Sequence, residues 1–505
     1  MSPFTIEELT VSSFHQALRE GKTTCTEVLK TYLTRISTHD PTLKTLITIQ
    51  PPSTLHEKAK EKDLETSNFL KNNIPLPPLH GVPILLKDNY TTSDLPTSSG
   101  CKALQTLSTT QDSEVVTRLR NAGAIILAKA NLHEFALHGT TTSSVLGQTL
   151  NPYDKTRTPG GSSGGTAAGL AANFALLGCG SDTMNSCRSP ASACGVVGFR
   201  PSKGIVPVSG IVPVSCTQDV AGPIGRCVED VMVLYDVMRG VDAFRSRDCG
   251  SGLSGCLTGQ GVRIGVLEGY FGLHGVGMDE DGDGDDVKEE NGVVQNIVRD
   301  ALVSVQDGLD ATLVPVQCPR DWELENLLKN ADTQPFEFKE CIDSFLSSEG
   351  VTSPHRSLKS IVESGEYHRE AVTDVFTAGL ENPKVFSMGS EEYAARLLII
   401  EALKESVKEI FENYHLDALV YPQQRQLPVK IGAMRQPNRN GILAAVTGSP
   451  AICIPAGFTE PTSEAPLGVP VGLELMGENG EDDDLLYLAR GIEKVLSVRK
   501  APILS

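Results

Sequence analysis

Short apolar runs alternate along the chain with segments in which apolar residues recur every three to four positions. Four runs are typical of buried strands: residues 84–86, 123–130, 261–269 and 416–422. Val471, Leu473 and Leu475 alternate with other residues, as in a strand. Helical periodicity follows a capping box at Thr24–Glu27 and three consecutive acids at 482–484. Strands that alternate with helices predict a layered α/β fold.

A length of 505 residues would allow about three domains on average. No linker in the sequence is long enough to require a division, so we expect one domain over residues 1–505. The segment 272–291, GLHGVGMDEDGDGDDVKEEN, is rich in glycine and acid and poor in apolar residues. It predicts an acidic surface insertion within that domain.

The charge balance is acidic, with 44 Lys and Arg against 63 Asp and Glu and a net charge of −19. This balance argues against nucleic-acid partners and anionic membrane surfaces, which both attract clustered positive charge. Residues 279–290 hold eight acids and one lysine and so supply −7 of that total. No secretory signal or membrane-spanning run is visible, so the sequence predicts a cytoplasmic protein with no membrane anchor.

Two patterns resemble metal sites, but their context argues against metal binding. His133 and His138 are one position too far apart for the zincin motif. Residues 279–290 satisfy the EF-hand expression, with Asp279 first and Glu290 last, but the Gly-rich segment before them would form a poor entering helix. None of the twelve cysteines stands in a C-x-x-C pair. We therefore expect no metal.

Candidate chemistry is concentrated in the stretch from Thr158 to Arg200, which contains six consecutive Gly and Ser residues, 160–165. A phosphate loop would need a G-K-[ST] ending, which is absent. The sequence G-x-S-x-G would suit a nucleophile elbow with Ser162 as nucleophile. A third hypothesis combines Ser162, Ser186 and Lys87, because a lysine at the end of a buried strand can lose its charge and act as a base. On these residues alone, a salt bridge from Lys87 to Asp88 is an equal alternative.

The motifs GVPILLKD, RTPGGSSGG and GSDTMNSCRSPASACGVVGFRPS, in this order, resemble the amidase signature family. The resemblance extends from about residue 9 to residue 496 and is weakest between about 243 and 370. It implies a mostly mixed central sheet covered by helices on both faces. It also implies hydrolysis of a carboxylic amide, or a related ester or carbamate, through a seryl acyl-enzyme without a cofactor.

The resemblance assigns a role to each of three residues. Ser186 matches the nucleophile, Ser162 matches the serine that follows a cis peptide bond and bridges the other two groups, and Lys87 matches the general base. Together they would form a Ser-cisSer-Lys triad that fulfils the roles of a Ser-His-Asp triad.

The resemblance also implies an oxyanion hole formed by backbone amides of Thr183, Met184, Asn185 and Ser186. The family usually has two glycines where this chain has Met184 and Asn185. If either position needs a positive φ, asparagine tolerates it better than methionine does. Backbone donors survive a change of side chain, so the hole need not be lost.

Further positions follow from the same resemblance. Ala136 lies in a loop that lines the acyl pocket of relatives, and Ser162 is also expected to contact the substrate. Arg188 matches a family arginine, for which we expect a structural ion pair with Asp182 or Asp219.

The substrate is therefore expected to be a small-molecule amide, without nucleic acid as a partner. Two alternatives stay open. The acyl-enzyme could transfer its acyl group to an amine, or close a ring, instead of reacting with water; or the Met-Asn change could have impaired the hole and left a non-catalytic binding homologue. The sequence leaves a homodimer open.

Overall fold

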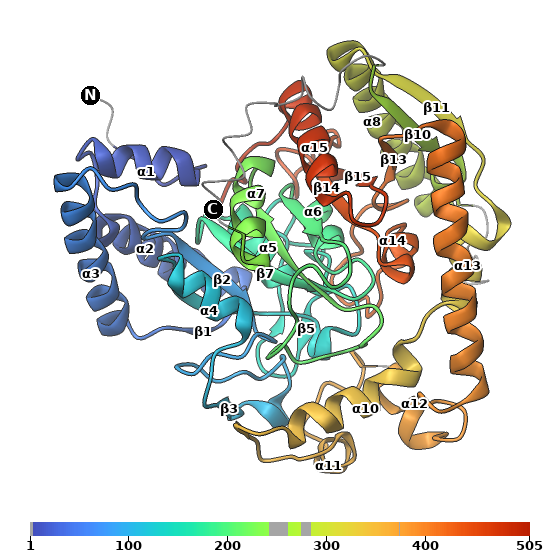
Figure 1. Cartoon of the computed structure of the whole chain (residues 1–505), viewed down its shortest axis with the longest axis horizontal. Helices are drawn as coiled ribbons and strands as arrows, with labels where there is room; N and C mark the ends of the chain where they lie inside the picture. Colours follow the sequence, from blue (N-terminus) through green and yellow to red (C-terminus); the bar gives the residue numbers. More distant parts are fainter. Residues whose placement is uncertain (1–3, 242–260, 274–283, 373, 505) are drawn as a thin grey trace.

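The computed structural model describes residues 4–241, 261–273, 284–372 and 374–504. Within these residues, eleven strands form one sheet that crosses the molecule (Figure 1). In spatial order the strands are β1 (Leu46–Ile49), β4 (Ile125–Ala130), β2 (Pro83–Lys87), β7 (Leu177–Asp182), β9 (Val220–Gly225), β8 (Val197–Arg200), β14 (Ala451–Phe458), β15 (Pro470–Met476), β13 (Ala418–Pro422), β10 (Arg263–Leu267) and β11 (Thr312–Val316).

The sheet is mixed. β2 is parallel to both β4 and β7, and β10 is parallel to both β11 and β13. The strands between these two groups pair in antiparallel fashion. The predicted α/β fold with a mixed sheet is therefore confirmed. Two short antiparallel ribbons lie outside it: β3 (Ser108–Thr109) with β12 (Val351–Thr352), and β5 (Thr142–Ser143) with β6 (Gly147–Gln148).

Helices cover both faces of the sheet, as the resemblance implied. The short helices α5 (Gly164–Ala171) and α6 (Arg188–Ala193) pack on one face. On the other face lie α7 (Val228–Arg239), α8 (Gly284–Leu309) and α15 (Asp482–Leu496), with α4 (Glu114–Asn121) packed against α7. Glycine permits the close approach on the first face, since a Cβ at Gly180 would lie 2.8 Å from both Ser163 Oγ and Cys187 Sγ.

The sequence signals mark several elements correctly. α2 (Cys25–Leu43) begins after Thr24 with the predicted capping box, and α15 begins at the three acids. The predicted apolar runs form β2, β4, β10 and β13. β15 alternates in sequence but is buried at every position, because helices cover both of its faces.

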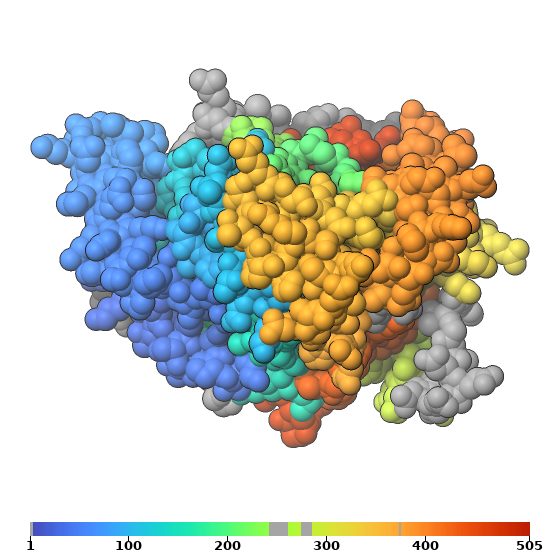
Figure 2. Space-filling model, turned by 90° about the horizontal axis from the view of Figure 1, so that it is seen from below, coloured from blue at the N-terminus to red at the C-terminus, as the bar shows by residue number. Residues whose placement is uncertain are grey.

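A second apolar cluster lies at one edge of the sheet, where α10 (Gln334–Ser347), α11 (Leu358–Ser364) and α12 (Asp374–Glu381) pack against residues that include Cys101, Leu104 and Phe135. These helices, yellow to orange, cover much of the face in Figure 2. The remaining helices are α1 (Val11–Arg19), α3 (Pro52–Lys71), α9 (Leu324–Asn330), α13 (Glu391–Tyr414) and α14 (Ile442–Thr447).

The predicted acidic insertion 272–291 is only partly a solvated segment. Residues 274–283, which hold the first part of the EF-hand pattern, lie outside the described residues. From Gly284 the chain forms helix α8. Glu290 forms an ion pair with Arg157 at 2.8 Å, and Asn291 is buried and donates to the carbonyl oxygen of Phe271. This end of the segment is therefore a packed helix, because Glu290 and Asn291 have partners elsewhere in the fold.

Candidate active site

Lys87 is the last residue of β2 and is fully buried. Its Nζ atom lies 2.7 Å from Ser162 Oγ and 2.9 Å from Ser181 Oγ. Asp88, the alternative partner of Lys87, forms its ion pair with Lys129 instead, at 3.1 Å. Burial lowers the pKa of Lys87 to about 8, although Cys187 and Asp182 act in the opposite direction. About a tenth of this lysine is therefore neutral at pH 7.

Ser162 lies in the Gly/Ser run between the sheet and α5. The peptide bond between Gly161 and Ser162 is cis, which is the conformation that the resemblance implies at this position. Thr141 fixes the run from both sides, since its hydroxyl donates to the carbonyl oxygen of Gly160 at 2.7 Å and accepts from the amide of Gly164 at 3.1 Å. The hydroxyl of Ser162 is thereby held against Lys87.

Ser186 lies in the turn that joins β7 to α6. The amide of Ser163 donates to its carbonyl oxygen at 3.1 Å, so the segments that carry the two candidate serines are in direct contact. Among the described residues, the hydroxyl of Ser186 forms no hydrogen bond with Ser162. Lys87 and Ser162 are thus hydrogen-bonded, and the segment of Ser186 lies next to that of Ser162, but the hydroxyl groups of the two serines are not in contact. Such contacts are often long in enzymes without substrate and shorten in the complex.

The turn before Ser186 presents a row of unused backbone donors. Within the part of the chain that the structure describes, the amides of Met184, Asn185 and Ser186 donate to no protein acceptor. Neither Met184 nor Asn185 has a positive φ, so the turn does not need the glycines that the family usually carries there. The half-buried side chain of Met184 packs against the apolar cluster to which β13 and α14 contribute residues.

A buried network of four charges holds this turn. Arg188 contacts Asp182 at 3.1 Å and Glu474, and Arg200 contacts Asp182 at 3.0 Å. Arg188 also donates to the carbonyl oxygen of Met184. Burial raises the pKa of Asp182, but the two arginines outweigh it and hold this pKa well below its usual value. The expected ion pair of Arg188 thus involves Asp182 and not Asp219.

Asp219 has a different partner, the hydroxyl of Thr183, at 2.6 Å. Because Thr183 begins the turn that leads to Ser186, this contact also fixes the turn.

Ala136 lies in a strained loop beside these segments. Phe135, Ala136 and Thr141 have φ values of 53°, 61° and 58°, in the left-handed region that residues with a side chain rarely adopt. Each costs about 1 kcal/mol or more and is retained only where the surroundings fix it. Thr141 is also the residue whose hydroxyl holds the Gly/Ser run at Ser162, so one of the strained residues directly fixes the site.

The two histidines of the same loop lie against each other. The rings of His133 and His138 are in edge-on contact, with 5.4 Å between centroids. Burial lowers the pKa of His133 to about 4 and that of His138 to about 2, so both are neutral. In the described ranges, no group of three His, Cys, Asp or Glu residues could hold a metal ion.

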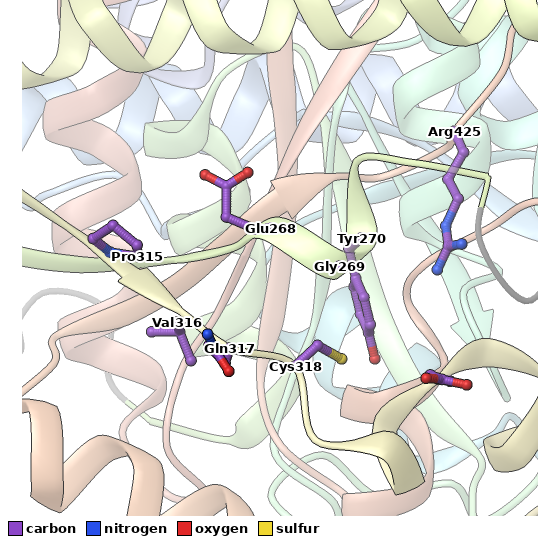
Figure 3. Close-up of a pocket in the computed structure, with 9 residues that line it drawn as sticks. Glu268, Gly269, Tyr270, Pro315, Val316, Gln317, Cys318 and Arg425 are labelled. Atoms are coloured by element: carbon purple, nitrogen blue, oxygen red, sulfur yellow. The ribbon is translucent and has the colours of Figure 1, made fainter.

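A cavity of about 440 Å³ lies at the carboxyl ends of β10 and β11 (Figure 3). Tyr270, Cys318 and Arg425 line it, and Figure 3 shows the Arg425 side chain extending toward Tyr270. Lys87, Ser162 and Ser186 are not among its lining residues. Asn440 joins the Tyr270 side of the cavity to the end of β13, since its amide group donates to the carbonyl oxygens of Tyr270 and Pro422.

Comparison with known proteins agrees with this geometry. The model of the Amidase family matches residues 27–273 and 300–486. The chain belongs to the Amidase family. One subunit of the glutamyl-tRNA(Gln) amidotransferase of Caldanaerobacter subterraneus subsp. tengcongensis is 30% identical over 518 residues, which cover 98% of each chain.

Two solved structures share the Amidase fold over almost all of their length. The peptide amidase of Stenotrophomonas maltophilia is 27% identical, with a TM-score of 0.80 and all of both chains covered. An amidase family protein of Bacillus anthracis is also 27% identical, with a TM-score of 0.78, over 99% of this chain and 93% of the other. The prediction of an enzyme that acts on carbon–nitrogen bonds of amides outside peptide bonds is confirmed.

Sequence reasoning missed two features of this Amidase family site. Ser181 lies one residue before Asp182 and contacts both Lys87 and Asn89, each at 2.9 Å. Ser181 lies within the recognised motif, but nothing in the neighbouring sequence indicates that it contacts Lys87. Arg439 lies about 250 residues after Ser186 in sequence, yet donates to Asn185 at 2.7 Å.

None of the helices in the described part of the chain is long and apolar enough to span a membrane.

Proposed function

We propose that this protein hydrolyses a small-molecule amide through an acyl-enzyme, with Ser186 as nucleophile, Ser162 as bridging serine and Lys87 as general base. The contact between Lys87 Nζ and Ser162 Oγ carries the proposal. A buried lysine with a pKa of about 8 is a suitable base, because about a tenth of it is neutral at pH 7. No cofactor takes part in the proposed steps.

The first half-reaction forms the acyl-enzyme. Ser186 Oγ attacks the amide carbon while its proton passes to Ser162, and the proton of Ser162 passes to neutral Lys87. When the tetrahedral intermediate collapses, the proton returns through Ser162 to the leaving nitrogen and the amine departs. Water then attacks the ester by the same relay, and the acid is released as Ser186 regains its proton.

The unused amides of the turn before Ser186 supply the oxyanion hole in this proposal. They lie next to the nucleophile and donate to no protein acceptor within the described ranges. Donors that are fixed before the reaction stabilise the charge that develops on the carbonyl oxygen without reorganisation. Arg188, through Met184, and Asp219, through Thr183, hold the turn in place.

Labelling with a fluorophosphonate probe tests the proposal. We expect one probe per chain on wild-type protein, and no labelling of Ser186→Ala when circular dichroism shows that this variant is folded. Failure of folded wild-type protein to label, together with no turnover of small amides, would favour the non-catalytic binding homologue. Labelling lost in Ser162→Ala but retained in Ser186→Ala would instead support the nucleophile elbow.

A second candidate is acyl transfer to an amine in place of water. The relative from C. subterraneus supports this candidate, because it is named as part of an amidotransferase and matches over 98% of both chains. Adding hydroxylamine to the amidase assay separates the two fates. A hydroxamate yield that far exceeds the share expected from simple partition with water would indicate transfer.

We further propose that the protein is cytoplasmic and that its binding partner is the small-molecule amide substrate. A homodimer stays a prediction, which light scattering would test.

A further inference from the structure

Arg439 reaches the candidate site from a short antiparallel contact between two segments. Gln424 and Arg439 form an isolated bridge, and opposite residues in such a pair project to the same face. The amide oxygen of Gln424 accepts from Ser189 Oγ at 3.4 Å, and Nη1 of Arg439 donates to Asn185 Oδ1 at 2.7 Å. Arg439 therefore points at the turn that contains Ser186, and Gln424 points at helix α6, which follows that turn.

The guanidinium group of Arg439 also lies against the strained loop, which in turn lies against the segment of Ser162. A side chain at Gly139 would collide with its Nη1 atom, and a side chain at Gly161 would come within 2.9 Å of the Gly139 carbonyl carbon. Gly139 belongs to the strained loop, and Gly161 precedes Ser162. The guanidinium group of Arg439 thus contacts the turn that carries Ser186 and the strained loop, and the strained loop in turn contacts the segment that carries Ser162.

This cation lacks a counter-charge in the described ranges. Arg439 is half-buried, its hydrogen-bond partner Asn185 is neutral, and no carboxylate forms an ion pair with it there. Asp182, the acid whose field reaches it, is already in contact with Arg188 and Arg200.

The remaining neighbours add no negative charge. Burial keeps His133 and His138 neutral, and the positive charge of Arg435 also reaches His138. Asn185 Nδ2 is buried without a hydrogen-bond partner. A partly desolvated cation and a free amide donor, in a protein of net charge −19, form a local site for an anion.

We propose that Arg439 binds a carboxylate carried by the amide substrate. The inference rests on the proposed function and narrows its substrate class to amides with an anionic group. A planar guanidinium group pairs with a carboxylate through parallel hydrogen bonds. Part-exposure leaves donors of Arg439 accessible, while Asn185 holds one edge of the group in place. The carboxylate can belong to the acyl part or to the amine part of the substrate.

Two matched substrate pairs test the inference and distinguish these two sources. Glutaric acid mono-p-nitroanilide and its methyl ester place the charge on the acyl part. N-butyryl-4-aminobenzoate and its methyl ester place it on the amine part. For wild-type protein we expect that, in one of the two pairs, kcat/KM for the acid is about 10- to 100-fold higher than for its methyl ester. The difference should come mainly from a lower KM for the acid. Arg439→Gln should bring that ratio close to one, and Arg439→Lys should give an intermediate ratio.

Arg435→Gln is the matched control, because it removes the same charge from an exposed position on the same loop. It should retain most of the preference. Equal values for acid and ester in wild type, or an equal loss of preference in Arg435→Gln, would overturn direct binding. Equal slowing of acid and ester in Arg439→Gln would show that Arg439 only positions Asn185. If Arg439→Gln does not fold, Arg439→Lys decides in the same way. Fluorophosphonate labelling of wild type tests the proposed function separately, so the two failures are distinguishable.

Discussion

The ammonium nitrogen of Lys87 lies 2.7 Å from the hydroxyl oxygen of Ser162, at the end of a strand from which water is excluded. Three parts of the chain produce this contact: β2 ends at Lys87, Thr141 holds the Gly/Ser run, and Gly180 allows that run to lie on the sheet. Burial lowers the pKa of this lysine, so its neutral form can act as a base.

The pH dependence of kcat/KM should report the titration of Lys87. Because burial lowers its pKa to about 8 and the neutral form is the base, the rate should rise with pH through about 8 and then level off. Lys87→Met should lower kcat/KM by about 100- to 10,000-fold and abolish this rise. A bell centred well below pH 7, or a retained rise in Lys87→Met, would contradict the assignment. Steady-state kinetics between pH 5 and pH 10 provide the measurement.

Replacement of Ser162 should break the relay without unfolding the protein. Ser162→Ala removes the hydroxyl that Lys87 contacts, so we expect kcat to fall by about 100-fold or more. Ser181→Ala is the matched control, since it removes the other hydroxyl on the same ammonium group but leaves the bridge, and kcat should fall by less than about 10-fold. Equal effects of the two changes would argue that Ser162 is a structural partner only.

The buried charge network predicts a large loss of stability on single replacement. Asp182→Asn leaves Arg188 and Arg200 without their shared carboxylate in a buried setting, which should lower the free energy of unfolding by about 3–5 kcal/mol. Lys404→Gln, which removes a surface pair with Glu401, should change it by less than about 1 kcal/mol. Urea denaturation of both variants makes the comparison. A loss below about 1 kcal/mol for Asp182→Asn would show that the network contributes little.

Part of this picture could be predicted from the sequence, and the reasons are physical. β2 and the Gly/Ser run were recognisable because burial and close packing restrict their residue types. Arg439 was not, because its role depends on a contact between segments far apart in the chain. The packed end of the 272–291 segment was not recognisable, because Glu290 resembles the exposed acids before it until Arg157 is placed beside it.

That same pair gives a prediction about calcium. Glu290 would be the last ligand of the EF-hand pattern, but its carboxylate binds Arg157 at 2.8 Å and accepts from the amide of Leu427 at 3.2 Å. Calcium would have to displace both partners and disrupt the first turns of α8. Millimolar calcium should therefore raise the melting temperature by less than about 1 °C, because a ligand stabilises only to the extent that it binds the folded state. Magnesium serves as the ionic control in the same thermal scan, and a rise of several degrees specific to calcium, lost in Glu290→Gln, would refute this prediction.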